Sequence, residues 1–337
     1  MKYKSSDNKK PVFIFVSAAM LLMLAILISL HSGFTDISVT DTMSVLFGQS
    51  DTITENIVLD IRLPRIMAAI LSGMALAASG AILQSVMQNS LADSGIIGIN
   101  AGAGLFVVLF LFLAGDFEYS IFLIPVFAFA GGLTVAFAVL ALSYRKSYGV
   151  RPIRLVLNGI AAGAGVSALM IVLSLLMSHE SYQFAAGFLA GTVWGASWMH
   201  VLIIAAGIVL FLPVVSSKVS ILNILSMNTL NVVSLGVDLK KERIILLACA
   251  VGLAAVSVSV SGAIAFVGLI APHFSRRIIG VDHKFVLPLS ALSGGLVVLI
   301  ADTIGRTLFF PAALPAGVIV AIIGAPYFIY LLMRTDA

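Results

Sequence analysis

Nine long runs of apolar residues, separated by short polar segments, dominate this sequence. They cover residues 11–31, 64–88, 94–114, 120–142, 155–177, 198–215, 243–275, 285–304 and 314–333. A helix needs about 20 apolar residues to cross the hydrocarbon layer of a membrane. The chain is 61% hydrophobic and 10% charged, whereas soluble proteins carry about 25% charged residues. Alternating ten-residue patterns typical of membrane β-barrels do not occur. The sequence therefore predicts an all-α membrane protein.

The run 243–275 is too long for one ordinary span and too short for two full ones. Basic residues stand at both of its ends: Lys240, Lys241, Arg243, Arg276, Arg277 and Lys284. If both groups are cytoplasmic, the chain must cross the membrane and return. We expect a turn at 257–262 between two short or broken helices, which membranes tolerate where protein covers the backbone. The total is then about ten transmembrane helices, with both termini cytoplasmic.

The distribution of charge supports this topology. Basic residues fall in segments assigned to the cytoplasm, except for Arg62, Arg65 and Arg306. The acidic segment 32–61 is too polar to span, and we expect an outer loop there with a short surface helix near 39–48. The run 11–31 is too long for a signal peptide and predicts an uncleaved first span. Residues 1–337 thus form a single transmembrane domain in this interpretation.

Several kinds of chemistry have no residues to support them. The sequence contains no P-loop, no His-Glu-x-x-His and no Cys/His spacing typical of zinc, and its one cysteine is Cys249. We therefore predict no catalytic residue, no cofactor and no metal site. Asp93, Glu180, Asp282 and Asp302 fall at or near the ends of the apolar runs, which argues against an intramembrane proton relay. Energy must come from a partner, or the protein is a passive pore. The net charge of +4 reflects membrane topology and not a nucleic-acid partner.

Small residues recur at helical spacing within the apolar runs. Gly73 and Ala77 are four residues apart, as are Gly159 and Gly163. This spacing allows helices to approach closely in lipid. The contacts could lie within one subunit, between subunits or along a transport pathway. A faint repeat, in which the Ser-Gly-Ala-Ile of 79–82 recurs at 261–264, leaves open a duplication of two halves.

Four stretches carry a resemblance to a known family. They are RLPR at 62–65 with the segment 72–104, SLGVD at 234–238, SGAIAFVGLIAPHFSRRIIGVDHK at 261–284, and ADTIGRTLF at 301–309 with the segment 314–332. In order and spacing they resemble the permeases of ABC importers for iron-siderophores, haem and vitamin B12, from about residue 60 onward. The resemblance implies ten spans and a place in the bacterial cytoplasmic membrane. It also implies three kinds of partner: a second permease, identical or paralogous, two cytosolic ATPases and an external substrate-binding protein.

The resemblance also implies roles for two sets of residues. Arg62, Arg65 and Arg306 would hold carboxylates of the binding protein, a task that suits planar guanidinium groups. The alternative is that they reach lipid headgroups. Arg62 and Arg65 lie one helical turn apart and could face the same way, and Asp302 could pair with Arg306.

The cytosolic loop 222–242 resembles the coupling region that contacts the ATPases. Its candidate contact residues are Asn228, Ser234, Leu235 and Gly236, although Thr229 and Asn231 replace acidic residues frequent in the family.

The expected function is uptake of a ferric siderophore by an ATP-driven importer of which this chain is the non-enzymatic permease. Vitamin B12 and haem remain alternative cargoes. A secondary carrier would need a buried coupling carboxylate or histidine, an intramembrane enzyme would need paired catalytic groups, and a passive channel would show flux without ATP. Each alternative therefore predicts a different requirement for transport.

Overall fold

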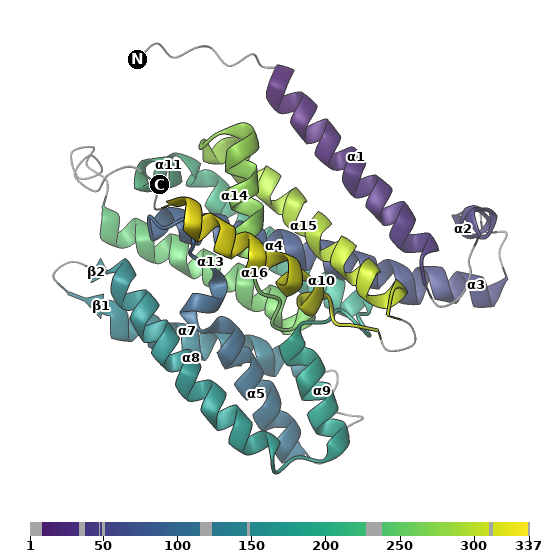
Figure 1. The fold of residues 1–337 in the computed structure, drawn as a ribbon, viewed down its shortest axis with the longest axis horizontal. Coiled ribbons are helices and arrows are strands. Elements are labelled where there is room, and N and C mark those ends of the chain that lie inside the picture. Colours follow the sequence, from purple (N-terminus) through teal and green to yellow (C-terminus); the bar gives the residue numbers. More distant parts are fainter. Residues whose placement is uncertain are drawn as a thin grey trace.

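The computed structural model describes residues 9–33, 38–46, 48, 51–114, 123–146, 149–226, 238–309 and 313–335. Ten helices within these residues follow the ten expected spans in order (Figure 1). They are α1 (Lys9–His31), α4 (Leu63–Val86), α5 (Ile99–Ala114), α7 (Ile124–Ser143), α8 (Pro152–Ser174), α10 (Trp198–Ser217), α13 (Leu239–Ser261), α14 (Val267–Ile279), α15 (His283–Thr307) and α16 (Ala316–Thr335).

Shorter elements connect these helices. They are α2 (Val39–Leu46), α3 (Thr52–Asn56), the π-helix η1 (Ile57–Arg62), the 3-10 helix η2 (Ser94–Ile97), α9 (His179–Ala190), α11 (Val219–Leu225) and an antiparallel pair of strands, β1 (Tyr144–Arg145) and β2 (Gly149–Val150). The predicted surface helix near 39–48 corresponds to α2.

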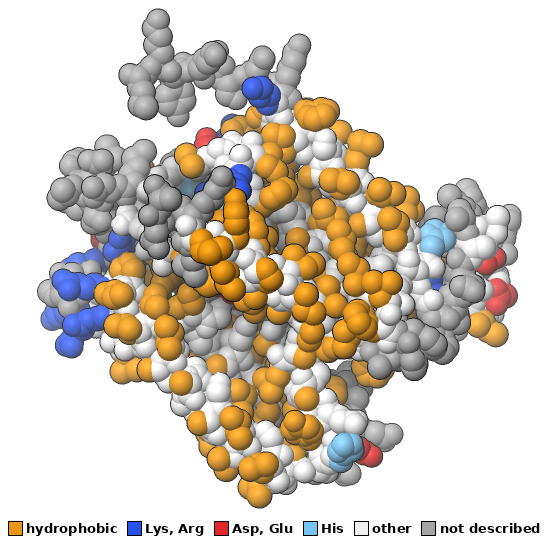
Figure 2. Space-filling view, viewed as in Figure 1, with side chains coloured by type: hydrophobic (Ala, Val, Ile, Leu, Met, Phe, Trp, Pro, Cys, Tyr) orange, Lys and Arg blue, Asp and Glu red, His pale blue; other side chains and the backbone are white. Residues whose placement is uncertain are grey.

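Seven of the helices are long and apolar enough to cross a membrane, judged by length and composition, and α5 and α16 are shorter apolar helices. The expected all-α membrane fold is therefore confirmed. Figure 2 shows apolar side chains over a broad belt of the surface. Lys and Arg side chains gather beside the β1–β2 strands, and acidic side chains gather at the opposite end near α2 and α3. This separation agrees with the charge rule used to orient the chain.

Three helices form the centre of the bundle. In the most apolar stretch of the helical segment containing α4, 83% of residues are buried, and α13 and α15 are also mostly buried. The corresponding value for α1 is 6%, and Figure 1 shows this helix at the edge of the bundle. α4 packs against α15, α13 and α14. Because α4 is surrounded by other helices, its small residues serve contacts within the subunit.

The segment before α4 differs from the prediction. The expected outer loop extends to residue 61, but residues 52–62 are helical. The elements α3, η1 and α4 therefore form one continuous helix. Pro64 lacks an N–H and its ring would crowd the carbonyl four residues earlier in a regular helix. The π-helical turns absorb this conflict, with the N–H of Leu63 bonding to the carbonyl of Val58. Pro64 thus marks a change of helix type.

The break in the run 243–275 also lies later than predicted. The serines at which a chain reversal was expected lie instead in the last turns of α13, and they are buried. Ser257 Oγ donates to the carbonyl of Ser72 at 3.0 Å, which makes a polar residue acceptable inside the helix. The chain leaves the helix at Gly262, with φ +66°, where a Cβ would lie 2.2 Å from the carbonyl oxygen of Phe188. Of the two helices in this run, α13 has full length and α14, with 13 residues, is short.

The break is held by Asp93, a half-buried residue whose carboxylate faces the interior. Its carboxylate lies beside the backbone N–H groups of Ser94, Gly95 and Phe266, and a Cβ on Gly268 of α14 would lie 2.4 Å from its Oδ1. Phe266 has φ +66°, an unusual backbone conformation for a large side chain. Asp93 therefore does not lie free at the end of a span. It joins the turn after α4 to the start of α14.

Candidate functional site

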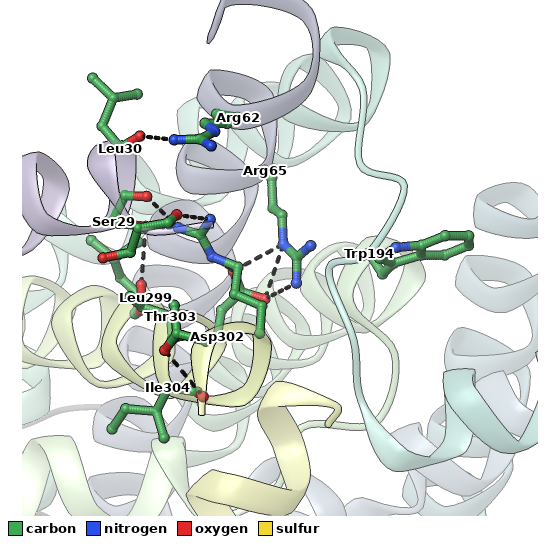
Figure 3. A network of polar contacts seen from close by, with 12 residues as sticks. Ser29, Leu30, Arg62, Arg65, Trp194, Leu299, Asp302, Thr303 and Ile304 are labelled. Carbon is green, nitrogen blue, oxygen red and sulfur yellow. Dashed lines mark hydrogen bonds and ion pairs between the residues drawn. The ribbon is translucent and has the colours of Figure 1, made fainter. Parts of the chain in front are cut away.

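Two of the three outer arginines, Arg65 and Arg306, converge on one carboxylate, and Arg62 lies beside Arg306 (Figure 3). The three arginines come from η1, α4 and α15, and Asp302 lies on α15 between them. The Nε and Nη2 of Arg65 donate to Asp302 at 2.9 Å and 2.7 Å, a two-point contact. The Nε of Arg306 lies 3.7 Å from the same carboxylate. The arrangement joins segments 237 residues apart in sequence.

Arg62 and Arg306 also hold the end of α1. Arg62 donates to the carbonyl of Leu30, and Arg306 donates to the carbonyls of Ser29 and Ser32. The last carbonyls of a helix have no partner within the helix and carry partial negative charge. Two guanidinium groups therefore cap α1, a helix with most of its apolar surface exposed. A Cβ on Gly33 would lie 2.9 Å from Arg62 and 3.2 Å from Arg306, so this glycine leaves room for both groups.

These contacts change two expectations about the arginines. Arg62 and Arg65 do not face the same way, because the wider turns of η1 direct Arg62 toward α1 while Arg65 points toward α15. Asp302 pairs chiefly with Arg65 and only secondarily with Arg306 four residues along its own helix. The cluster is largely internal: Arg62 is 6% exposed, and the side chains of Arg306 and Arg65 are 10% and 17% exposed.

On the inner side, the predicted coupling residues Asn228, Ser234, Leu235 and Gly236 lie outside the described residues. The neighbouring α11 is described. Beside it lies a polar cavity of about 490 Å³. Residues from α4, α11, α14 and α15 line it, among them Gln84, Asn223 and Arg276. Arg276 donates to the side chain of Gln84. This cavity opens beside the end of α4 opposite to the arginine cluster.

The residues predicted to pack helices divide into two groups. A Cβ on Gly73 would lie 2.2 Å from the carbonyl oxygen of Gly294, and Ala77 packs at the same place. A Cβ on Gly159 would lie 1.8 Å from the carbonyl oxygen of Ile96. These three residues thus permit contacts inside the subunit. Among the described residues, nothing lies within 4 Å of a Cβ on Gly163, so this position of α8 is open to a neighbour outside the chain.

Other polar residues support the scaffold. The indole N–H of Trp198 donates to the carbonyl of Leu59 at 3.0 Å, and His200 completes a capping box with Ser197 at the start of α10. Trp194 is 72% exposed beside a second cavity of about 590 Å³, which His200 also lines. Cys249 is buried. Among the residues that the structure describes, no group of three metal-ligating side chains occurs.

Hydrogen bonds join three side chains that line the inner cavity, Ser85, Asn223 and His283, and no sequence motif predicts them. His283 follows Asp282, which caps α15, and the pair is typical of an ordinary loop. No motif spacing connects residues 85, 223 and 283, because their contact depends on how α11 folds against α4 and α15. Only the assembled helices bring these side chains together.

Comparisons with known proteins agree over almost the whole chain. The model of the FecCD transport family matches residues 21–334. The iron(3+)-hydroxamate import system permease FhuG of Bacillus subtilis is 40% identical, over 98% of this chain and 99% of that protein. The Fe(3+) dicitrate transport permease FecD of Escherichia coli is 36% identical, over 82% and 85%. An inward-facing structure of a metal-chelate type ABC transporter aligns with a TM-score of 0.83 and 29% identity, covering 96% of this chain and 99% of that one.

Proposed function

The chain belongs to the FecCD transport family, and from this we propose that it is the permease subunit of an ATP-driven importer that carries a ferric siderophore across the bacterial cytoplasmic membrane. The family is that of ABC transporter permeases, so the chain is a multi-pass membrane transport protein and not itself an enzyme. The similarity to iron-chelate permeases over nearly the full length is the observation that carries the proposal.

The cargo follows from the relatives. FhuG and the iron-uptake permease FeuC of Bacillus subtilis, 40% and 39% identical, are named for iron import. Other relatives are permeases of citrate and achromobactin systems, beside the hydroxamate system of FhuG. The hydroxamate and citrate named for two of these systems both bind a ferric ion through oxygen atoms. We therefore rank a ferric chelate ahead of vitamin B12 or haem.

The proposed partners follow from the same membership. An external binding protein delivers the chelate, two cytosolic ATPases supply energy, and a second permease completes the pathway. We place delivery at the arginine cluster, where Arg65 has the most exposed of the side chains around Asp302. We place the ATPase contact in the segment 222–242. The open face of α8 around Gly163 suits the second permease, since small residues allow close helix contact.

Uptake of iron-labelled chelates by a strain lacking its own permease tests the proposal. We expect ATP-dependent uptake of a ferric siderophore, with cobalamin and haem transported poorly. Uptake that stops when the proton gradient is collapsed at constant ATP would indicate a secondary carrier. Flux that persists without ATP would indicate a channel. Preferred uptake of cobalamin or haem would overturn the proposed cargo and retain the proposed mechanism.

A further inference from the structure

A chain of hydrogen bonds connects α11 to the inner ends of two central helices. The Oδ1 of Asn223 accepts the backbone N–H of His283 at 2.8 Å and lies 2.7 Å from the Nδ1 of the same histidine. The Nδ2 of Asn223 donates to Asp282 at 2.8 Å. Asn223 thus contacts the first residues of α15 through both ends of its amide.

His283 extends the chain to α4. Its Nε2 lies 2.5 Å from the hydroxyl of Ser85, and both residues are almost fully buried. Because Asn223 presents an oxygen, Nδ1 must carry the proton, and Nε2 of the neutral ring can then accept the one hydroxyl proton of Ser85, for which the carbonyl of Ala81 at 2.9 Å is the competing acceptor. The three side chains therefore form a directed sequence that runs from Ser85 to His283 to Asn223.

Apolar contacts and a further hydrogen bond hold the rest of α11. Leu222 and Leu225 are fully buried, and the side chain of Gln88 on the turn after α4 donates to the carbonyl of Leu225 at 2.9 Å. Apolar contacts alone permit sliding, since they have no directional preference. The hydrogen bonds of the Asn223 amide are directional, so they fix the position of α11 relative to α15.

α4 and α15 are themselves fastened along their length. Arg65 and Asp302 join them on the outer side, and Gly73 and Gly294 place their backbones in direct contact further in. Gly73 follows Arg65 by eight residues and Gly294 precedes Asp302 by eight, so the register is constant. Ser85 lies a further 12 residues along α4, so the two fastened ends are about 30 Å apart, comparable to the thickness of the hydrocarbon layer.

We propose that Asn223 is a positioning residue that fastens α11 to the α4–α15 pair, so that a displacement of the coupling segment moves both ends of this pair together. The proposal rests on the proposed function, because it takes 222–242 as the region on which the ATPases act. Coupling between distant sites can be carried by hydrogen bonds, packed side chains and rigid helices that connect them. Asn223, His283 and Ser85 connect α11 to α4 and α15, the two helices that Arg65 and Asp302 join at the outer end.

A donor–acceptor exchange tests the role of Asn223. Asn223→Asp places two carboxylates where the amide and Asp282 now meet at 2.8 Å. We expect it to lower the amount of ferric siderophore transported per ATP about tenfold, the effect of losing roughly one hydrogen bond. Adding Asp282→Asn restores one donor facing one acceptor when the new amide turns its NH₂ toward position 223 and its oxygen toward the N–H of Lys284, so that it still caps α15. The double variant should recover transport per ATP to within about twofold of the starting protein.

The measurement uses the permease co-purified with its ATPases, reconstituted with the binding protein. Asn158→Asp is the matched control, because Asn158 donates to Ser143 at 2.9 Å near the start of α8 and lies away from α11. Ser85→Ala is a milder second variant that removes a single hydroxyl from the chain of contacts, and it should also lower transport per ATP.

The outcomes separate the two proposals. Normal co-purification and ATP hydrolysis with reduced transport per ATP, rescued in the double variant, supports the positioning role. A double variant no better than Asn223→Asp, or an Asn223→Asp variant with unchanged transport per ATP, overturns it. A starting protein that binds no ATPase or transports without ATP overturns the proposed function itself, and the inference about Asn223 with it.

Discussion

The guanidinium of Arg65 and the carboxylate of Asp302 face each other edge to edge across α4 and α15, with two N–O contacts of 2.9 Å and 2.7 Å. The Asp302 side chain is 2% exposed, so water screens this pair weakly. A buried pair of this kind is costly to break, because the remaining charge loses its partner. The contact also fixes the position of α15 relative to α4 at the outer end.

Asp302→Asn should therefore destabilise the protein by about 3 kcal/mol or more, since two arginines lose their counter-charge. Thermal unfolding of the detergent-purified protein measures the effect. Glu242→Gln is the matched control, because Lys218 and Glu242 also approach to 2.7 Å but are more exposed. We expect the control to cost about 0–1 kcal/mol. Equal effects of the two substitutions would contradict the account of the outer cluster.

Arg62 and Arg306 should be needed to hold α1. Arg62→Ala leaves the carbonyl of Leu30 without its guanidinium partner, so the end of α1 loses one of its two guanidinium caps and keeps that of Arg306. We expect thiol labelling of a Ser32→Cys probe to become several times faster. Labelling of the same probe with Arg154→Ala, a cationic residue on the opposite side of the membrane, serves as the control. Unchanged labelling after Arg62→Ala would show that the arginine does not cap α1.

Gly73 and Gly163 should respond differently to a larger side chain. Gly73→Val drives a side chain into the backbone of α15 and should cost about 1–3 kcal/mol or prevent folding. Gly163→Val meets open space within the described part of this chain and should leave the unfolding temperature of the isolated subunit unchanged. If α8 contacts a second permease, the same variant will weaken self-association in cross-linking experiments. A stable Gly73→Val protein would contradict the close approach of α4 and α15.

The carboxylate of Asp93 should be required at the break between α13 and α14. In an Asp93→Asn variant, the amide would present a single oxygen to the three backbone N–H groups that lie beside the carboxylate, and its NH₂ would face a donor. We expect this variant to lower stability by about 1–3 kcal/mol, measured by thermal unfolding. Asp282→Asn should have little effect, because one Asp282 oxygen accepts both Asn223 and the N–H of Lys284, and asparagine retains such an oxygen. Comparable losses in both variants would contradict this role for Asp93.

Much of the fold follows from the sequence, because the length of each apolar run and the side of the membrane on which charged residues lie largely determine the topology of a membrane protein. The ten helices and the isolation of Arg62, Arg65 and Arg306 from the other cations could be predicted in this way. Their partners could be predicted only in part, because the expected Asp302–Arg306 pair is present at 3.7 Å while the closer partner of Asp302 is Arg65. The π-helical turns of η1 direct Arg62 toward α1, so that Arg65 and not Arg62 pairs with Asp302. These turns arise from the steric conflict at Pro64, which no hydrophobic pattern reveals.

Contacts between distant elements were also beyond prediction. The break at Gly262 comes later than the serine-rich stretch suggests, because the serine hydroxyls bond to backbone carbonyls and leave α13 intact. Asn223 carried no signal, since an isolated asparagine after an apolar run is compatible with many environments. Its importance follows from the placement of α11 beneath His283.

Transport by the reconstituted complex, with each partner confined to one side of the membrane, tests the central claim most directly. The binding protein with its ferric siderophore is added on the side of Arg65, and ATP is supplied on the side of Ser85. We predict iron accumulation only when both are present on these opposite sides, and a large loss with Arg62→Glu combined with Arg65→Glu while membrane insertion is retained. Accumulation that needs neither ATP nor the binding protein would contradict the account.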